Sequence, residues 1–320
     1  MIRAYAATLN TDIAPADTTY ARNVPEPDSA PQSEALATAV IDWFDVNARD
    51  LPWRREGFSP WGTLVSEFML QQTPVSRVIP RLDEWLTRWP MPEALASVPP
   101  GEAVRAWKSL GYPRRALWLH ACAVAITEQY GGVVPDDVDA LLALPGIGDY
   151  TARAVSAFAY GRRHPVVDTN IRRVIARVVS GDAEPAPPSA RRDLTAMEAL
   201  LPAADGRARA FNAGMMELGA IICTARSPRC DVCPLRNICA WRAAGYPPYD
   251  GPRKAVQKKY EGSDRHVRGL IMRELRGSHI PITAAEIEPL WPHAAQRNRA
   301  LAGLIADGLA VPTDDGYTLP

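Results

Sequence analysis

The sequence predicts a mainly all-α protein, and two observations carry this prediction. Apolar residues recur every three to four positions in successive segments, the spacing that places them on one face of a helix. The alternation that is typical of strands is nearly absent before residue 245. Proline and glycine residues separate the periodic segments and mark where helices end. We expect helices at about residues 61–72, 75–88, 114–129, 148–160, 168–179, 189–201 and 208–222.

The N-terminal residues 1–33 are predicted to form a disordered tail. They are rich in proline, alanine, threonine and aspartate, and they show no sustained period. Residues 1–35 hold two basic and five acidic side chains, so this stretch carries a net charge of −3. The pattern becomes helical from Glu34, because Leu36 and Val40 share one helix face.

The composition is that of a globular protein rather than a disordered or membrane-spanning one. Hydrophobic residues make up 47% of the 320 residues and charged residues 22%; a chain of this size commonly folds as two or more domains. No run approaches the roughly 18 apolar residues of a membrane helix, and the N-terminus lacks the apolar core of a secretory signal. We therefore expect a cytoplasmic protein with no membrane partner. With 36 basic and 36 acidic residues the net charge is zero, which argues weakly against nucleic acid but leaves room for a local basic groove.

The C-terminal quarter of the chain is predicted to hold a linker and a small module. Residues 246–263, rich in proline, glycine and lysine, are interpreted as a basic linker. In residues 264–320, a capping box from Thr283 to Glu286 precedes a further helix and two apolar segments joined by an Asp-Asp-Gly turn. Helices followed by a hairpin suggest a winged-helix-like module. DNA binding and protein docking or stabilisation both stay open as its role. Residues 252–276 carry eight basic against three acidic side chains, which favours cationic contact with a duplex.

Four of the five cysteines lie within seventeen residues, which points to one metal centre. Cys223, Cys230, Cys233 and Cys239 are spaced C-x6-C-x2-C-x5-C, so their thiolates can converge. Structural zinc usually takes two short knuckles, and only the middle pair has that spacing. An iron–sulfur cluster is larger and tolerates longer loops, so spacing favours neither metal decisively. The fifth cysteine, Cys122, lies beside alanines on an apolar helix and is expected in the core.

A glycine-containing turn between two predicted helices suggests a phosphate clamp. In Leu144-Pro145-Gly146-Ile147-Gly148, the glycines let another chain approach the backbone, and the next helix offers free amides and the positive end of its dipole. This is the helix-hairpin-helix pattern, which binds the DNA backbone without reading sequence. Six arginines follow the turn: Arg153, Arg162, Arg163, Arg172, Arg173 and Arg177. They form either solvated helix faces or a local basic groove, which a net charge of zero does not exclude.

Two carboxylates have the features of an acid–base pair. Glu67 shares a helix face with Leu64 and Gln71, and burial at the edge of an apolar face raises the pKa of a carboxyl group as a general acid requires. An ordinary exposed glutamate is the alternative. Asp168 precedes a predicted helix, which fits an N-cap that stays ionised. One protonated and one ionised carboxylate are the usual equipment for cleaving a glycosidic bond.

Taken together, these motifs resemble one family. From about residue 34 to 245, the chain resembles MutY-type adenine DNA glycosylases of the endonuclease III (helix-hairpin-helix) superfamily. The resemblance implies a helix-hairpin-helix DNA glycosylase fold with its core at residues 34–245. Within that core, residues 57–167 would form a six-helix barrel, and residues 34–56 with 168–245 an iron–sulfur cluster domain. Besides the glycine turn and the cysteines, the motifs are Leu51-Pro52-Trp53-Arg54, Ser66-Glu67-Phe68-Met69-Leu70-Gln71-Gln72-Thr73, Ser109-Leu110-Gly111-Tyr112, Val167-Asp168-Thr169-Asn170 and Met216-Glu217-Leu218-Gly219-Ala220.

The resemblance also implies roles for residues at matching positions. Glu67 would protonate N7 of adenine, and Asp168 would stabilise the oxocarbenium-like sugar. Tyr150 stands where bifunctional relatives carry a lysine, so no Schiff base should form. The four cysteines would hold one structural [4Fe-4S] cluster per chain. Contacts to DNA or to the flipped adenine fall on Trp53, Arg54, Leu70, Gln71, Gln72, Tyr112, Gly146, Gly148, Asn170 and Glu217, with Gln72 and Tyr112 as wedges in the duplex.

The implied activity is base excision repair: hydrolysis of the N-glycosidic bond of adenine mispaired with 8-oxoguanine or guanine. The implied enzyme is a monomer that acts on double-stranded DNA at the nucleoid. Relatives usually carry a C-terminal Nudix-like domain that helps to read 8-oxoguanine. Residues 246–320 show no such pattern and resemble the short forms of actinobacteria, so the degree of preference for 8-oxoguanine stays open.

Two other functions stay open beside adenine removal. A thymine glycosylase acting on G·T mismatches shares the fold, the cluster, the aspartate and often a tyrosine at position 150. Glu67 with its neighbours Gln71 and Gln72 favours adenine. A non-catalytic iron–sulfur DNA-binding protein would not need Glu67 and Asp168 together, so their joint presence argues against that alternative.

Overall fold

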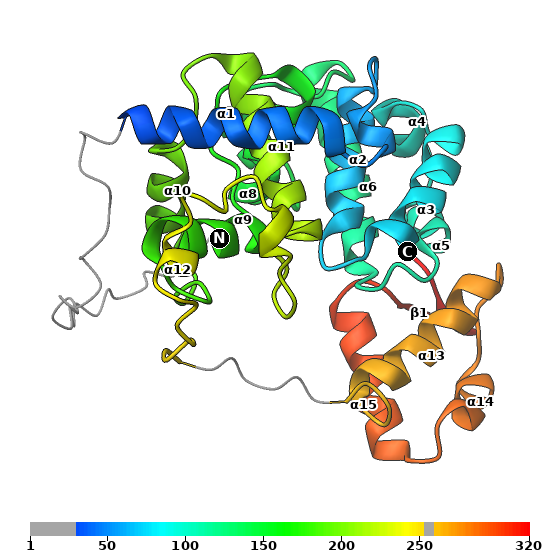
Figure 1. The fold of residues 1–320 in the computed structure, drawn as a ribbon. Coiled ribbons are helices and arrows are strands. Elements are labelled where there is room, and N and C mark those ends of the chain that lie inside the picture. Colours follow the sequence, from blue (N-terminus) through cyan, green and yellow to red (C-terminus); the bar gives the residue numbers. More distant parts are fainter. Residues whose placement is uncertain (1–29, 253–258) are drawn as a thin grey trace, which may run out of the picture.

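The computed structural model describes residues 30–252 and 259–320. Two helical lobes lie side by side, and a smaller C-terminal module lies beneath one of them (Figure 1). Helix α1 begins at Ala30, within the predicted tail and four residues before the expected start of the helix. The remainder of that tail lies outside the described residues.

The first lobe contains the segment expected to form the barrel. Four of its helices lie where the periodicity predicts them, but α4, α5 and α7 were not predicted. Helices α4 and α5 begin at Pro92 and Pro100, in a proline-rich stretch that was interpreted as a break between helices. Proline is well tolerated in the first turn of a helix, because the amide it lacks has no partner there. The helices are α2 (Pro60–Leu70), α3 (Val75–Arg88), α4 (Pro92–Ala96), α5 (Pro100–Trp107), α6 (Arg114–Tyr130), α7 (Val138–Leu142) and α8 (Asp149–Tyr160).

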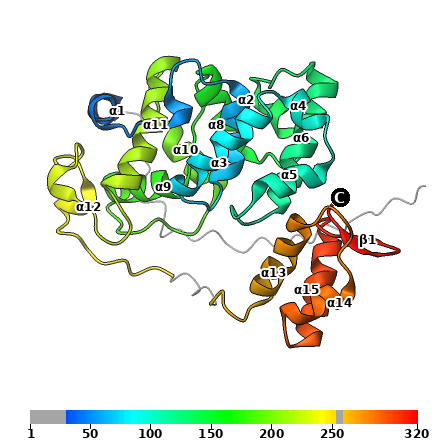
Figure 2. The ribbon, with the colours of Figure 1, turned by 90° about the vertical axis from the view of Figure 1, so that its right-hand side faces the viewer.

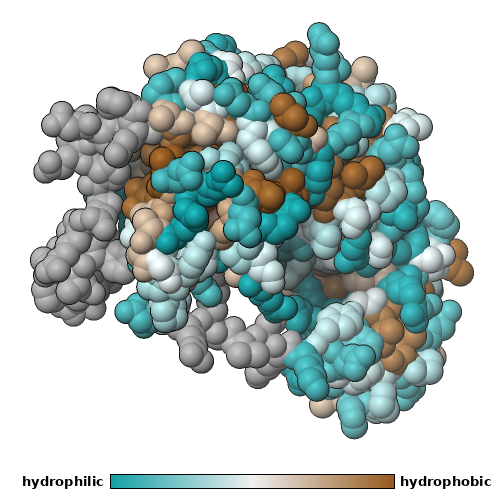
Figure 3. Space-filling model, viewed as in Figure 1, coloured by the Kyte–Doolittle hydropathy of each residue, from teal (hydrophilic) through white to brown (hydrophobic). Residues whose placement is uncertain are grey.

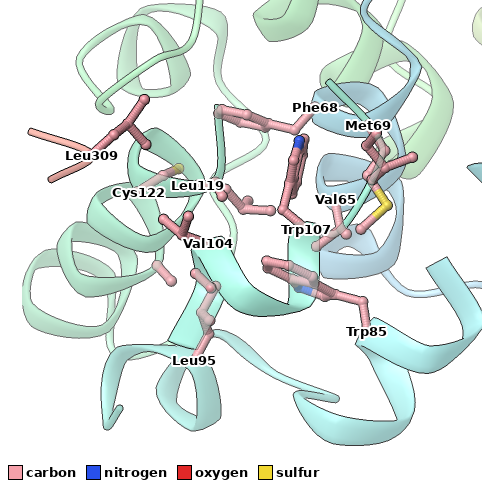
Figure 4. Close-up of a cluster of buried hydrophobic side chains, with 14 of the residues drawn as sticks. Val65, Phe68, Met69, Trp85, Leu95, Val104, Trp107, Leu119, Cys122 and Leu309 are labelled. Carbon is pink, nitrogen blue, oxygen red and sulfur yellow. The ribbon is translucent and has the colours of Figure 1, made fainter. Parts of the chain in front are cut away.

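The core of this lobe is built around tryptophans. The rings of Trp85 and Trp107 are fully buried and meet edge to face, with 5.6 Å between their centroids. Phe68 of α2 packs in the same cluster, which fixes one face of that helix (Figure 4). Cys122 also lies in this core with no exposed surface, as predicted from the sequence.

The second lobe joins the two ends of the region from residue 34 to 245. Leu36 and Val40 of α1 pack against Phe211 and Leu218 of α11, so segments distant in the sequence share one apolar cluster. Helix α8 contacts helices of both lobes. The elements are α1 (Ala30–Asn47), η3 (Pro52–Arg54), α9 (Thr169–Ile175), the π-helical turn η4 (Ala176–Ser180), α10 (Ala190–Glu198), α11 (Asp205–Ile221), η5 (Cys230–Val232) and α12 (Ala240–Ala243).

The C-terminal module has the element order of a winged helix. The capping box is present, since the Thr283 hydroxyl accepts from the Glu286 amide and the Glu286 carboxylate accepts from the Thr283 amide. Ile282 forms a bridge to Tyr317, which adds a third strand position to the hairpin. The elements are α13 (Asp264–Gly277), α14 (Ala284–Ile287), η6 (Glu288–Leu290), α15 (Ala294–Ala306), β1 (Val311–Thr313) and β2 (Gly316–Thr318).

This module is packed against the first lobe, a relation that the sequence did not indicate. Leu309 belongs to the same buried cluster as Cys122 and Leu119 (Figure 4). The Gly101 amide donates to the carbonyl oxygen of Pro320 at 2.7 Å. Figures 1 and 2 both place α13 beneath α5. Module and lobe therefore share one hydrophobic core.

Most of the described basic residues of α13 are engaged within the fold. Arg268 pairs with Asp307, Arg273 pairs with Glu274, and Arg276 donates to the Lys108 carbonyl oxygen. Arg253, Lys254 and Lys258 lie outside the described residues. These pairings weaken the interpretation of the module as a free cationic surface for DNA.

Hydrophilic and apolar residues are interspersed on the face seen in Figure 3. Among the helices of residues 30–252 and 259–320, none has the length and apolar character needed to cross a membrane.

Candidate active site

A pocket between the two lobes gathers most of the predicted site residues. Its walls come from α2, the η3 turn, α8, the start of α9 and α11. Tyr112, Gly146 and Gly148 are not part of its lining. The predicted residues that line it are Trp53, Arg54, Glu67, Leu70, Gln71, Gln72, Tyr150, Asp168, Asn170 and Glu217.

Glu67 is buried in this pocket, so the alternative of an exposed glutamate is wrong. Helix α2 starts at a Ser59 N-cap, whose hydroxyl accepts from the Gly62 amide at 3.0 Å, and runs with both faces buried. Only 6% of Glu67 is exposed. Burial raises the pKa of Glu67 to about 7; a hydrogen bond with Tyr150 opposes the rise, and the nearby charge of Asp168 adds to it. The carboxyl group can therefore carry a proton near neutral pH.

This pKa predicts a pH dependence of the reaction. If protonated Glu67 is the acid, the single-turnover excision rate should fall tenfold per pH unit well above pH 7, because the pKa of Glu67 is about 7. A rate that stays level from pH 6 to pH 9 would contradict this role. The measurement is a pH profile of the chemical step at saturating enzyme.

Asp168 has the N-cap position that the sequence predicted. Its carboxylate accepts from the backbone amides of Asn170 and Ile171 at 2.9 and 2.7 Å, and from the Asn170 side chain at 2.8 Å. Burial raises the pKa of Asp168 above its ordinary value, and these three hydrogen bonds counter the rise. The group is thus held in one orientation by donors that favour its ionised form.

The side chain of Asn170 is in turn fixed by a hydrogen bond from Arg173. The Arg173 guanidinium donates to the Asn170 side-chain oxygen at 2.8 Å, and also to the carbonyl oxygens of Gly219 and Cys223 at 2.6 and 2.7 Å. Position 219 must be small, since a Cβ there would lie 2.7 Å from the Asn170 Cβ. Helix α9 and the start of the cysteine segment are therefore fixed relative to Asp168.

Glu217 lines the same pocket and forms ion pairs there through a buried carboxylate, while its partners Arg49 and Arg54 stay partly exposed. Burial alone would raise the pKa of Glu217, but hydrogen bonds from Arg49 and Arg54 outweigh burial and lower it to about 2. Arg49 binds both carboxylate oxygens at 2.7 Å, and Arg54 binds one at 2.9 Å. Sequence reasoning missed Arg49. Two clues could have found it. Arg49 lies five residues before Arg54, and a carboxylate buried on the apolar helix α11 needs more than one cationic partner.

The two predicted wedge loops are joined by another residue that the sequence analysis did not single out. Arg115, only 3% exposed, donates to the Gln71 carbonyl oxygen at 2.6 Å and to the Gly111 carbonyl oxygen at 3.1 Å. Burial lowers the pKa of Arg115 to about 10. Gln72 and Tyr112 adjoin these carbonyls, and both have positive φ angles, of 53° and 48°. Arg115 thus couples the end of α2 to the loop that carries Tyr112.

The glycine turn lies between α7 and α8. Gly146 has φ of 76°, and a Cβ there would approach the Trp118 Cβ to 2.5 Å, so glycine is required for packing within the protein. Gly148 begins α8, is exposed, and has open space where a Cβ would stand. Both glycines are exposed, so the backbone of the turn is open to another chain.

The six arginines after the turn all make contacts within the fold. Arg173 and Arg177 donate to backbone carbonyls around the cysteine segment. The other four pair with carboxylates: Arg153 with Asp149, Arg162 with Asp136, Arg163 with Glu198 and Arg172 with Asp193. Their use in internal contacts weakens the interpretation of a basic groove formed by these residues.

The four clustered cysteines line one pocket beneath α9 and η4. Arg177, Arg236 and Trp241 complete its wall. In the part of the chain that the structure describes, no three His, Cys, Asp or Glu side chains converge closely enough to hold a single metal ion. The Arg177 guanidinium lies 3.3 Å from the Cys223 sulfur and can donate to a ligated thiolate. Four thiols around a shared space fit a group larger than one ion.

Comparison with known families defines the class of the protein. A model described as HhH-GPD superfamily base excision DNA repair protein matches residues 65–198. A model of the iron–sulfur binding domain of endonuclease III matches residues 223–239, the span of the four cysteines. Two solved structures share the fold. A thermostable thymine-DNA glycosylase is 28% identical, with a TM-score of 0.59 over 68% of this chain and 100% of that one. Endonuclease III in a non-covalent DNA complex is 22% identical, with a TM-score of 0.57 over 67% of this chain and 97% of that one.

Two curated relatives narrow the assignment. An adenine DNA glycosylase of Mycobacterium tuberculosis is 50% identical over 299 residues, 93% of this chain and 97% of the relative. An adenine DNA glycosylase of Mycolicibacterium smegmatis is 54% identical over 278 residues, 87% of this chain and 93% of the relative. The chain therefore belongs to the adenine DNA glycosylase family, within the helix-hairpin-helix superfamily of base excision DNA repair proteins.

Proposed function

We propose that this protein is a monofunctional glycosylase that hydrolyses the N-glycosidic bond of adenine opposite 8-oxoguanine or guanine in duplex DNA. The observation that carries the proposal is a buried carboxyl group, Glu67, with a pKa of about 7 and an oriented carboxylate, Asp168, in the same pocket. The pocket that holds Glu67 and Asp168 is lined by both lobes of the chain, so the proposed chemistry needs no residue from a second copy, and we propose that the protein acts as a monomer. Its substrate would be chromosomal DNA, so we expect it to work in the cytoplasm at the nucleoid.

In the proposed reaction, Glu67 donates its proton to N7 of the flipped adenine. The bond between the sugar and the base then breaks, and its electron pair leaves with the base. Tyr150 hydrogen bonds with Glu67 and orients it. Glu217, with its partners Arg49 and Arg54, offers polar contacts to the adenine edge in the same pocket. Trp53 and Leu70 supply apolar contacts in the same pocket.

Asp168 acts on the sugar. Its carboxylate faces the pocket with both oxygens held by the start of α9. An ionised group fixed in this way stabilises the positive charge that develops at C1′ as the base departs. Water then adds to C1′ and gives up a proton, which restores the acid form of Glu67, and an abasic site remains.

We assign one [4Fe-4S] cluster per chain to the four cysteines. The match to an iron–sulfur binding domain and a pocket lined by all four thiols support this assignment. Such a cluster would hold the 223–239 segment in shape beside Asn170 and Asp168, through the Arg173 contacts. No redox change is needed for hydrolysis.

The test of this function is a single-turnover assay on duplexes with one adenine opposite 8-oxoguanine, guanine or thymine. We expect excision of adenine from the first two and little from the third. The thymine glycosylase of Aeropyrum pernix, 37% identical over 211 residues, keeps thymine removal open as the second candidate. A duplex with thymine opposite guanine is therefore included, and preferential release of thymine would reject the proposed function.

Tyr150 predicts the absence of a lyase step. Because a phenol cannot form a Schiff base with the sugar, borohydride should trap little covalent protein–DNA adduct under conditions of complete adenine excision. Y150K provides the contrast, since it places an amine at this position and should raise the trapped fraction. Abundant adduct with the wild-type protein would mean that another amine acts as nucleophile.

A further inference from the structure

The loop between α5 and α6 carries Tyr112 in an unfavourable backbone conformation. Lys108 has φ of 45° and ψ of −122°, and Tyr112 has φ of 48°. Residues with a side chain rarely adopt positive φ, and such conformations persist only when neighbouring groups hold them. Tyr112 is 48% exposed, which places its ring at the surface, ready to contact DNA.

Side-chain donors bind four consecutive carbonyls of this loop. The Lys108 carbonyl oxygen accepts from Arg276, and the Ser109 carbonyl oxygen accepts from Arg77. The Leu110 carbonyl oxygen accepts from Thr73 at 3.2 Å. The Gly111 carbonyl oxygen accepts from Trp107 at 2.9 Å and from Arg115 at 3.1 Å. Only Arg276 comes from the C-terminal module; the other donors belong to the first lobe.

Arg276 belongs to a reciprocal contact between two helix ends. Its guanidinium binds Lys108, the residue that caps the C-terminus of α5. In return, Arg105 of α5 donates to the carbonyl oxygens of Leu275 and Arg276, at 3.3 and 2.7 Å, in the last turn of α13. The last carbonyls of a helix lack intrahelical partners, and each arginine satisfies carbonyls of the other helix. Arg276 is also held by its own helix, because its Nε donates to the Met272 carbonyl oxygen at 3.1 Å.

We infer that Arg276 is a positioning residue for the Tyr112 loop and that the C-terminal module serves base flipping by holding this wedge in place. The inference rests on the proposed function. In this inference the C-terminal module stabilises the conformation of a loop of the glycosylase core. Its contribution to catalysis is to keep Lys108 in its strained conformation, so that Tyr112 enters the duplex without a further ordering step.

The test compares R276M with R273M, which removes the same charge from an exposed position on the same helix. Single-turnover excision is measured on two duplexes, one with adenine opposite 8-oxoguanine and one with adenine opposite an abasic site. In the second duplex, extruding adenine breaks no base pair and needs less help from a wedge. We expect R276M to slow excision about tenfold on the first duplex, the size expected for one charge-assisted hydrogen bond, and much less on the second. R273M should match the wild type on both.

An equal loss on both duplexes would overturn the inference, because a protein that is only destabilised loses activity on both alike. A flatter salt dependence of duplex binding in R276M would also overturn it, because that result assigns Arg276 to a phosphate. R276K retains a charged donor and should recover part of the loss. In a Y112A background, where the wedge is absent, R276M or R276K should cause no additional loss.

Should R276M not fold, the pair of R276K and Y112A still decides the question, because additive losses from these two variants would exclude action through Tyr112. The controls separate this inference from the proposed function. An active wild type with an equally active R276M contradicts the inference alone. A wild type that excises no adenine from either duplex rejects both.

Discussion

E67Q should lower the single-turnover rate of adenine excision by about 10²–10⁴, the contribution of a positioned general acid. Glutamine retains the size and hydrogen-bonding ability of Glu67 but has no proton of the required acidity. Binding of the mispaired duplex should persist, because the wedge loops and the glycine turn are unchanged. The measurement pairs excision under single-turnover conditions with a binding titration on the same duplex.

The matched control is E128Q, the same chemical change on the exposed face of α6. It should excise adenine at the wild-type rate. E67Q excising at that rate as well would remove Glu67 from the mechanism.

A stability measurement adds an independent readout for the same variant. The pKa of Glu67 is raised from 4.5 to about 7 by folding, so the folded protein retains a proton that the unfolded chain releases. The free energy of unfolding therefore falls as pH rises through this window. E67Q lacks this term, so its stability relative to the wild type should increase between about pH 4.5 and 7. A constant difference in stability across that range would show that Glu67 is not buried in solution as it is here.

C230S should abolish cluster assembly and with it most DNA binding. Four thiolates share the ligation, and metal binding in such sites is coupled to folding of the segment that supplies the ligands. The wild-type protein should contain about four iron atoms per chain and absorb broadly in the visible range. The variant should be colourless and should lose secondary structure on mild heating, as followed by circular dichroism.

C122A is the control for this prediction, since Cys122 lies in the core of the other lobe. Its thiol lies among apolar side chains, away from the pocket that the other four cysteines line. This variant should retain the full iron content, with a loss of stability of about 1 kcal/mol from the small cavity. Stoichiometric zinc without iron in anaerobically purified wild-type protein would refute the iron–sulfur assignment.

Local features of the fold were predictable because they depend on neighbours in the chain. The periodicity placed α2, α3, α6 and α8 within one or two residues at almost every end. The capping box at Thr283 and the hairpin after α15 depend on contacts a few residues apart, and both were found. Helices α4 and α5 were missed for an equally local reason, since a proline that ends one helix can also begin the next.

Most of the site residues were predicted from the family resemblance, and Glu67 and Asp168 also from their places on predicted helices, but the electrostatics of the site were not predicted. The sequence contained a glutamate on a helix face and an aspartate before another helix. Whether Glu67 was buried beside Tyr150 or exposed depended on α8 packing against α2, a contact between distant segments. Arg49 was missed because its partner Glu217 lies 168 residues further along the chain.

By itself, the sequence determined the class of fold and the segment that matches an iron–sulfur binding domain, because helix periodicity, caps and cysteine spacing are written in consecutive residues. It also singled out Glu67 and Asp168 as candidates for the chemistry. Only the tertiary structure decided which arginines hold Glu217, which donors hold the Tyr112 loop, and that the C-terminal module packs on the first lobe. These contacts join segments that the chain order leaves far apart, as Arg276 and Lys108 are, 168 residues apart. Their formation depends on how whole helices pack, which no local pattern encodes.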